Sequence, residues 1–167
     1  MKSNLLFDFT VSRDDNTIRV KREFNASLEL VWKAWTTAGL LDQWWAPKPY
    51  RTETKSLDFK EGGRWLYAMI SPENEAHWCK ADYKKIDLQK LISWLDAFCD
   101  EHGNENTGKP RSLWTNIFTE ENGITTVNIT LQHDSFADIE LMIAMGFKEG
   151  LTMALGNLDE LLPALQK

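Results

Sequence analysis

Hydrophobic and polar residues alternate along much of the first 133 residues, which is the pattern of strands with one buried face. The alternation begins with a pair of segments, 5–11 and 17–24, that a polar turn separates. It returns at 52–59, 64–70, 77–86, 90–99, 113–119 and 125–133. Gly-Gly at 62–63 and Asn-Gly at 122–123 are turn signals between neighbouring segments. The pattern predicts an antiparallel sheet that starts with an N-terminal hairpin at 5–24.

The period changes to that of a helix in three places. Residues 28–35 follow a candidate N-cap, Ser27, and residues 39–45 form a second short helix before Pro47. A helix from 136 to 162 is predicted after Ser135, and we expect it to be continuous. Gly146 and Gly150 lie one turn apart on it, so they allow either close approach to the sheet or room beneath the helix.

The order of these elements predicts one α+β domain that spans residues 1–167. A long amphipathic helix has to bury its apolar stripe, and a curved antiparallel sheet has to bury one face. Each can cover the other. The two short helices are marginal alone, so we expect them to pack over one end of the same sheet.

Five of the eight tryptophans fall between residues 32 and 65. This segment and the order of the elements resemble the START-like (helix-grip, SRPBCC) superfamily. The closer resemblance is to the branch named for the C-terminal domain of the activator of the heat-shock-90 ATPase. The matching sequences extend over residues 18–162 and comprise Phe24–Ala26, Val31–Thr36, Leu41–Pro47, Asp58–Trp65, Asp96–Phe98 and, in the last helix, Gly146, Gly150, Leu155 and Leu158.

The resemblance implies a helix-grip fold with a cavity between the long helix and the sheet. Members of the superfamily bind lipids, hormones, polyketides and other apolar molecules, and some are cyclases or aromatases. The named branch implies a possible chaperone partner as well. The first strand, at 5–11, is an extension that many relatives lack.

Strand alternation turns every second side chain towards the predicted helix. The residues expected to line a ligand cavity are Trp65, Tyr67, Met69, His77, Trp94, Asp96, Phe98, Trp114, Asn116 and Phe118 of the sheet, with Met142, Gly146 and Gly150 of the helix. The alternative is that the aromatic rings fill a core and that Asp96 and Asn116 face water. Of the adjacent Trp44 and Trp45, one is expected to pack on the sheet and the other to be partly exposed beside Pro47.

Catalytic and metal chemistry have weak support in the sequence. Asp96 in an aromatic cavity, paired with Tyr67 or His77, is the best candidate for proton transfer. No nucleophile motif or phosphate loop accompanies it. His77 and Cys79 share a strand face, but no second such pair completes a zinc site. We therefore expect a binding protein without metal or cofactor, and an enzyme of the cyclase or aromatase type in the same cavity is the alternative.

Charge and composition limit the classes of partner that the protein is expected to bind. The net charge of −6 and the absence of a Lys/Arg cluster disfavour nucleic acid and anionic membranes. No apolar run has the length of a membrane span, no signal peptide is evident, and two cysteines make no disulfide framework. These features predict a cytoplasmic protein. The expected aromatic cavity with few polar groups predicts that it binds a small apolar molecule. A chaperone contact at 44–50 or 100–111, and a monomer or a homodimer, stay open.

Overall fold

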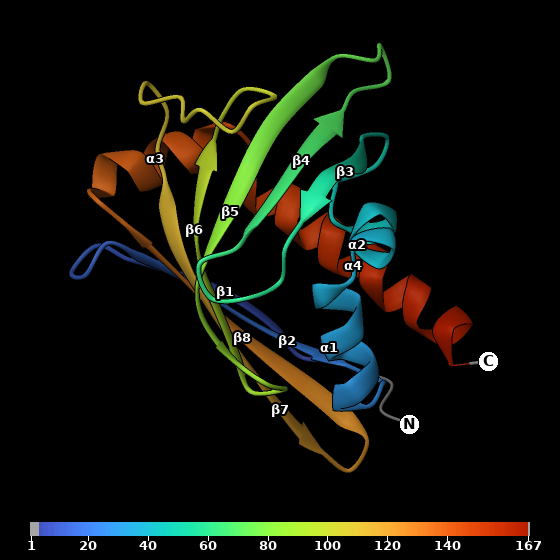
Figure 1. Ribbon diagram of the computed structural model, residues 1–167. Coiled ribbons are helices and arrows are strands. Elements are labelled where there is room, and N and C mark those ends of the chain that lie inside the picture. The colour runs from blue at the N-terminus through green and yellow to red at the C-terminus, as the bar shows by residue number, and fades with distance from the viewer. Residues whose placement is uncertain (1–3, 167) are drawn as a thin grey trace.

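The computed structural model describes residues 4–166, so the ends of the predicted domain, residues 1–3 and 167, lie outside the described residues. One sheet and four helices make up the fold (Figure 1). The strands are β1 (Phe7–Ser12), β2 (Thr17–Phe24), β3 (Arg51–Leu57), β4 (Arg64–Ile70), β5 (Ala76–Asp87), β6 (Leu91–Phe98), β7 (Ser112–Glu121) and β8 (Ile124–His133). The helices are α1 (Leu28–Thr36), α2 (Ala38–Trp44), α3 (Phe136–Ala144) and α4 (Phe147–Leu165).

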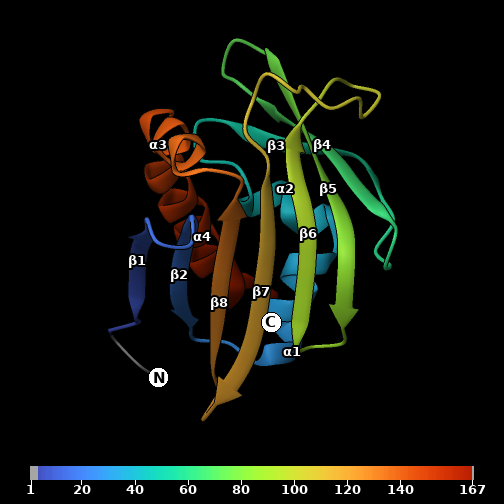
Figure 2. The same ribbon diagram turned by 90° about the vertical axis from the view of Figure 1, so that its left-hand side faces the viewer.

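The strands form a single eight-stranded antiparallel sheet in the order β1-β2-β8-β7-β6-β5-β4-β3. Each predicted strand is present, with ends that differ by two residues or fewer. Figure 2 shows the sheet in front of α1, α2 and α4, so these helices lie on one side of it. The α+β helix-grip architecture predicted from the sequence is therefore confirmed.

The continuous helix predicted over 136–162 is wrong, because the chain breaks into α3 and α4 at Gly146. Gly146 has a φ of 90°, in the left-handed region that glycine adopts without steric cost. Ser135 caps α3 as predicted, since its hydroxyl accepts a hydrogen bond from the backbone N–H of Asp138 at 3.2 Å. The break lets the two helices take different directions over the sheet.

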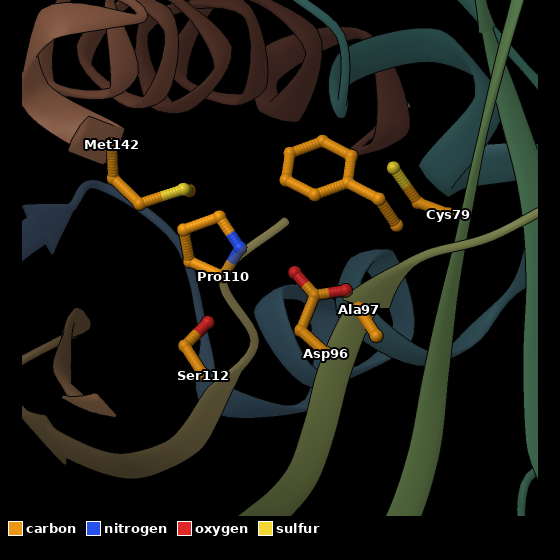
Figure 3. A pocket seen from close by; sticks show the side chains of 7 residues that line it. Cys79, Asp96, Ala97, Pro110, Ser112 and Met142 are labelled. Atoms are coloured by element: carbon orange, nitrogen blue, oxygen red, sulfur yellow. The ribbon is translucent and has the colours of Figure 1, made fainter. Parts of the chain in front are cut away.

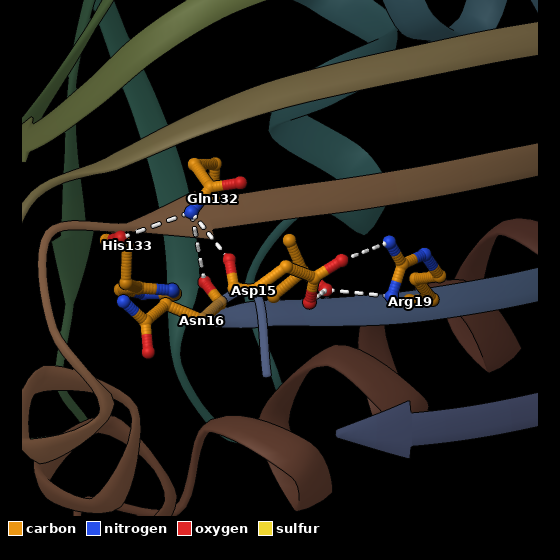
Figure 4. Close-up of polar contacts among 6 residues, drawn as sticks. Asp15, Asn16, Arg19, Gln132 and His133 are labelled. Carbon is orange, nitrogen blue, oxygen red and sulfur yellow. Dashed lines mark hydrogen bonds and ion pairs between the residues drawn. The ribbon is translucent and has the colours of Figure 1, made fainter. Parts of the chain in front are cut away.

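The turn of the N-terminal hairpin is fastened to the neighbouring strand β8. Gln132 Nε2 donates a hydrogen bond to the backbone oxygen of Asp15 at 2.7 Å, and the Asp15 carboxylate in turn pairs with Arg19 (Figure 4). Asn16, next in the turn, takes a left-handed φ of 54° that asparagine tolerates. The first strand therefore pairs within the chain, on the outer side of β2.

The strand register fixes which side chains face the helices. Tyr67 of β4 lies opposite Cys79 of β5, which lies opposite Phe98 of β6. Trp94 of β6 lies opposite Trp114 of β7 in the same way. Because directly opposed residues share a sheet face, these aromatic side chains gather on the inner side, as strand alternation predicted.

Within residues 4–166, none of the helices could cross a lipid bilayer. The longest of them, α4, contains Lys148, Glu149, Asp159 and Glu160.

Candidate functional site

A cavity of about 460 Å³ lies between the inner face of the sheet and the junction of α3 with α4. Its volume falls in the range of sites that hold small organic molecules. Most of its lining is apolar or aromatic. The lining residues are Trp45, Pro47, Tyr50, Tyr67, Met69, His77, Cys79, Asp96, Phe98, Trp114, Met142, Met145, Gly146, Phe147, Gly150, Leu151 and Ala154.

Nine of the thirteen residues expected at a cavity border this one, and four do not. Those that border it are Tyr67, Met69, His77, Asp96, Phe98, Trp114, Met142, Gly146 and Gly150. Those placed elsewhere are Trp65, Trp94, Asn116 and Phe118, which are all buried in the core. For these four residues the expectation of a cavity lining is wrong, because they belong to the filled core.

The reason for that correction is the depth to which α1 and α2 enter the concave face. Trp35 of α1 meets Trp94 with ring centroids 6.4 Å apart and Phe118 at 5.6 Å. Asn116 is fully buried, and its side-chain amide donates a hydrogen bond to the backbone oxygen of Ile92 at 3.0 Å. The aromatic rings thus fill this end of the space, and the 460 Å³ cavity lies at the end below α3.

Both Trp44 and Trp45 are buried, so the expectation that one of them would be partly exposed is wrong. The Trp44 indole donates a hydrogen bond to the backbone oxygen of Ala34, which ties α2 to α1. Trp45 lies between the filled core and the cavity. Its ring centroid is 5.3 Å from that of Trp65 and 5.7 Å from that of Trp114. Trp45 is therefore a buried wall of the cavity.

Three polar groups, from Trp45, Tyr67 and Cys79, interact in series beside the cavity. Trp45 Nε1 donates a hydrogen bond to the hydroxyl of Tyr67 at 3.1 Å, and the Tyr67 hydroxyl also interacts with the Cys79 thiol. Burial is the main cause that raises the pKa of Tyr67, and the nearby Asp96 carboxylate raises it further. Burial raises the pKa of the Cys79 thiol in the same way. Both groups therefore stay protonated and neutral near pH 7.

Asp96 is the one acidic side chain among the described residues that line the cavity. Its Oδ1 atom is covered and has no hydrogen-bond partner within the described part of the chain. Burial raises the pKa of Asp96 to about 8, against the lowering effect of the Ala97 backbone N–H and the Trp114 indole. Near neutral pH this carboxyl group is therefore held mainly in its protonated form.

A second, smaller cavity of about 20 Å³ lies next to Asp96, below Met142 of α3 and beside Pro110 and Ser112. Figure 3 shows Asp96 and Cys79 directed towards this space from the sheet. Its volume suffices for one water molecule and excludes an organic ligand. A ligand that reaches Asp96 would therefore have its body in the larger cavity.

The proton-transfer pairs expected from the sequence are not formed. Among residues 4–166, no hydrogen bond joins Asp96 to Tyr67 or to His77. His77 is exposed at the rim, where its ring lies 6.1 Å from that of Tyr50. No three His, Cys, Asp or Glu side chains within the same residues are placed to bind a metal ion.

Several lining residues were not expected from the sequence. Phe147, Leu151 and Ala154 continue the face of Gly150 along α4, and helical spacing would have identified them. Pro47 and Tyr50 lie in the loop after α2. Loop conformation is set by tertiary contacts, so no periodic signal could have placed these two residues at the rim.

The fold and the cavity between helix and sheet define a protein of the helix-grip class. The model of the family described as "Activator of Hsp90 ATPase homolog 1-like protein" matches residues 25–163, and the chain belongs to this family. The family description names a chaperone ATPase activator, and it assigns no ligand to the cavity.

Solved structures support the same fold. Protein Ms6760 from Mycobacterium smegmatis is 28% identical, with a TM-score of 0.86 over 95% of this chain and 97% of that chain. A protein from Staphylococcus epidermidis is also 28% identical, with a TM-score of 0.81 over 93% and 94% of the two chains. A protein from Arthrobacter aurescens superposes with a TM-score of 0.89 at 22% identity, over 94% and 91%. Curated proteins give no match.

Proposed function

We propose that this protein binds a small apolar or aromatic molecule in the cavity between α4 and the sheet. The observation that carries the proposal is the 460 Å³ cavity with its mainly apolar lining. The handful of polar groups in that lining, such as Asp96 and His77, would orient the ligand. Membership of a helix-grip family supports the same function, since the resemblance implies binding of apolar ligands.

The enzyme alternative has less support from the geometry. Cyclase or aromatase chemistry in this cavity would use Asp96 as the proton donor, with Tyr67 or His77 as its partner, and neither residue is hydrogen-bonded to it in residues 4–166. Unchanged turnover of a candidate substrate by an Asp96→Asn variant would exclude this role. A cytoplasmic location is part of the proposal, and the free thiols of Cys79 and Cys99 suit a reducing compartment.

Native mass spectrometry of the purified protein tests the proposed function. A bound ligand would add mass to the native protein, and this mass would disappear under denaturing conditions. Gly150→Leu places a side chain in the cavity, where an added Cβ at residue 150 would meet only Pro47 Cγ, at 3.7 Å. We expect this variant to fold and to lose the extra mass.

Gly156→Leu is the matched control. Gly156 lies in the same helix, outside the cavity lining, and an added Cβ there would have no neighbour within 4 Å. We expect it to keep the ligand. An extra mass that persists in Gly150→Leu would place the ligand elsewhere, and a protein that never carries or takes up any apolar molecule would contradict the proposal.

A further inference from the structure

The cavity has an electrostatic asymmetry that restricts the chemistry of its ligand. Its described lining includes one carboxylate, that of Asp96, and no lysine or arginine. On β5, His77 lies at the exposed rim, and Lys80 belongs to the opposite sheet face, where it donates a hydrogen bond to the backbone oxygen of Gly103 at 2.9 Å. An anionic ligand would therefore find no lysine or arginine and, where Asp96 is ionised, a like charge. A cationic ligand would have a counter-ion in the ionised Asp96 carboxylate.

The groups that face Asp96 from the packed elements leave it without a cation. Tyr67 of β4 and Cys79 of β5 are neutral, and Trp114 of β7 donates a single N–H that also bonds to Ser112 Oγ at 3.1 Å. Met142 is the neighbour from α3. Asp82 on the other face of β5 adds only negative charge. A covered carboxylate oxygen without a partner is costly, and a bound donor would remove that cost.

Aromatic rings surround the place where that donor would lie. Trp45 is 5.7 Å from Trp114 and 6.5 Å from Tyr67, measured between ring centroids, and all three border the cavity together with Asp96. Ring faces attract cations within about 6 Å. A carboxylate among indole and phenol rings therefore favours a protonated amine over a neutral hydroxyl group.

We propose that the ligand of this cavity is an amine with an apolar or aromatic body, whose ammonium group pairs with Asp96 between Trp45, Tyr67 and Trp114. This inference rests on the binding function proposed above and specifies the chemical class of the ligand. The body of the ligand fills the space towards Met69, Phe147 and Leu151, and the ammonium donates to the unpartnered oxygen of Asp96. Where Asp96 carries a proton beforehand, binding releases that proton to water.

The test uses three probes with one carbon skeleton: 4-phenylbutylamine, 4-phenylbutan-1-ol and 4-phenylbutanoate. Their dissociation constants are measured by calorimetry at pH 8.5, where the amine is charged and Asp96 is largely ionised. We expect the amine to bind at least tenfold more tightly than the alcohol, and the carboxylate to bind most weakly. In Asp96→Asn we expect the amine to lose this advantage while the alcohol keeps its affinity.

Asp87→Asn is the control, because Asp87 is an exposed carboxylate at the end of β5, outside the cavity. It should leave all three affinities unchanged. Equal or tighter binding of the alcohol or the carboxylate overturns the amine assignment and leaves the proposed binding function standing. An amine preference that survives in Asp96→Asn also overturns it. Absence of binding by all three probes counts against both proposals.

Discussion

The indole N–H of Trp45 donates a hydrogen bond to the hydroxyl of Tyr67, with 3.1 Å between nitrogen and oxygen. Trp45 comes directly after α2, and Tyr67 lies in the middle of β4. This one hydrogen bond therefore joins the end of α2 to the inner face of the sheet. Both residues are buried. The same pair separates the tryptophan-filled core from the cavity below α3.

Tyr67→Phe should lower the free energy of unfolding by about 1–3 kcal/mol, because it leaves the buried Trp45 N–H without an acceptor. Urea denaturation followed by tryptophan fluorescence measures the change. Tyr83→Phe is the control, because Tyr83 is buried but has no side-chain hydrogen bond in residues 4–166. Its effect should stay within about 0.5 kcal/mol. Equal losses in the two variants would mean that the hydrogen bond contributes nothing specific.

The strands and their inward faces could be predicted from the sequence because a period of two is a local signal. Tyr67, Asp96 and Trp114 all face the helices, as alternation indicated. The break at Gly146 could not be predicted in this way. The sequence pattern around a glycine in a helix is the same whether the φ of that glycine is negative or, as at Gly146, 90°.

The division of the inner face into a filled half and a half with a cavity could not be predicted from the sequence either. It depends on how far Trp35 and Trp45 reach across the sheet, which the packing of α1 and α2 decides. Trp94 and Trp114 show that strand alternation does not separate core residues from cavity residues. They stack with ring centroids 5.2 Å apart and share one strand-face pattern, yet only Trp114 borders the cavity.

Gly146→Ala should destabilise the protein by about 1–2 kcal/mol, because alanine is strained at the left-handed φ of 90° although no atom lies within 4 Å of its Cβ. Gly156→Ala is the matched variant inside α4, also without neighbours but with ordinary helical backbone. It should stabilise the protein by about 1 kcal/mol. Opposite shifts in the thermal midpoint are the expected result. Stabilisation by both substitutions would show that α3 and α4 tolerate a continuous helix.

Asn157→Ala should lower the free energy of unfolding by about 1–3 kcal/mol. The buried Asn157 amide donates to the backbone oxygens of Ala46 at 3.0 Å and Trp44 at 3.4 Å, so it holds α4 against the end of α2. Gln43→Ala removes a similar bond, to the backbone oxygen of Gly39 at 3.0 Å, at an exposed position where water replaces it. Chemical denaturation should show at most about 0.5 kcal/mol for this control. A loss as large as that of Asn157→Ala would contradict the argument from burial.

The pH dependence of stability should reveal the environment of Asp96. Its pKa is raised from the ordinary 3.8 to about 8 in the folded protein, mainly by burial, with Asp82 adding to the shift. Between these pH values the folded state holds a proton that the unfolded chain has released. The free energy of unfolding therefore falls as the pH rises from 4 to 8, at a rate approaching about 1.4 kcal/mol per pH unit.

Asp96→Asn removes this titration, so the variant should gain stability relative to the wild type from pH 4 to pH 8 and then keep a constant advantage. His133, whose pKa burial lowers, titrates in both proteins and cancels in the comparison. Asp87→Asn should follow the wild-type profile, since its carboxylate is exposed. Urea titrations at half-unit pH intervals give the three curves. Parallel curves for the wild type and Asp96→Asn would show that Asp96 is ionised at an ordinary pKa, with solvent or a counter-ion beside it.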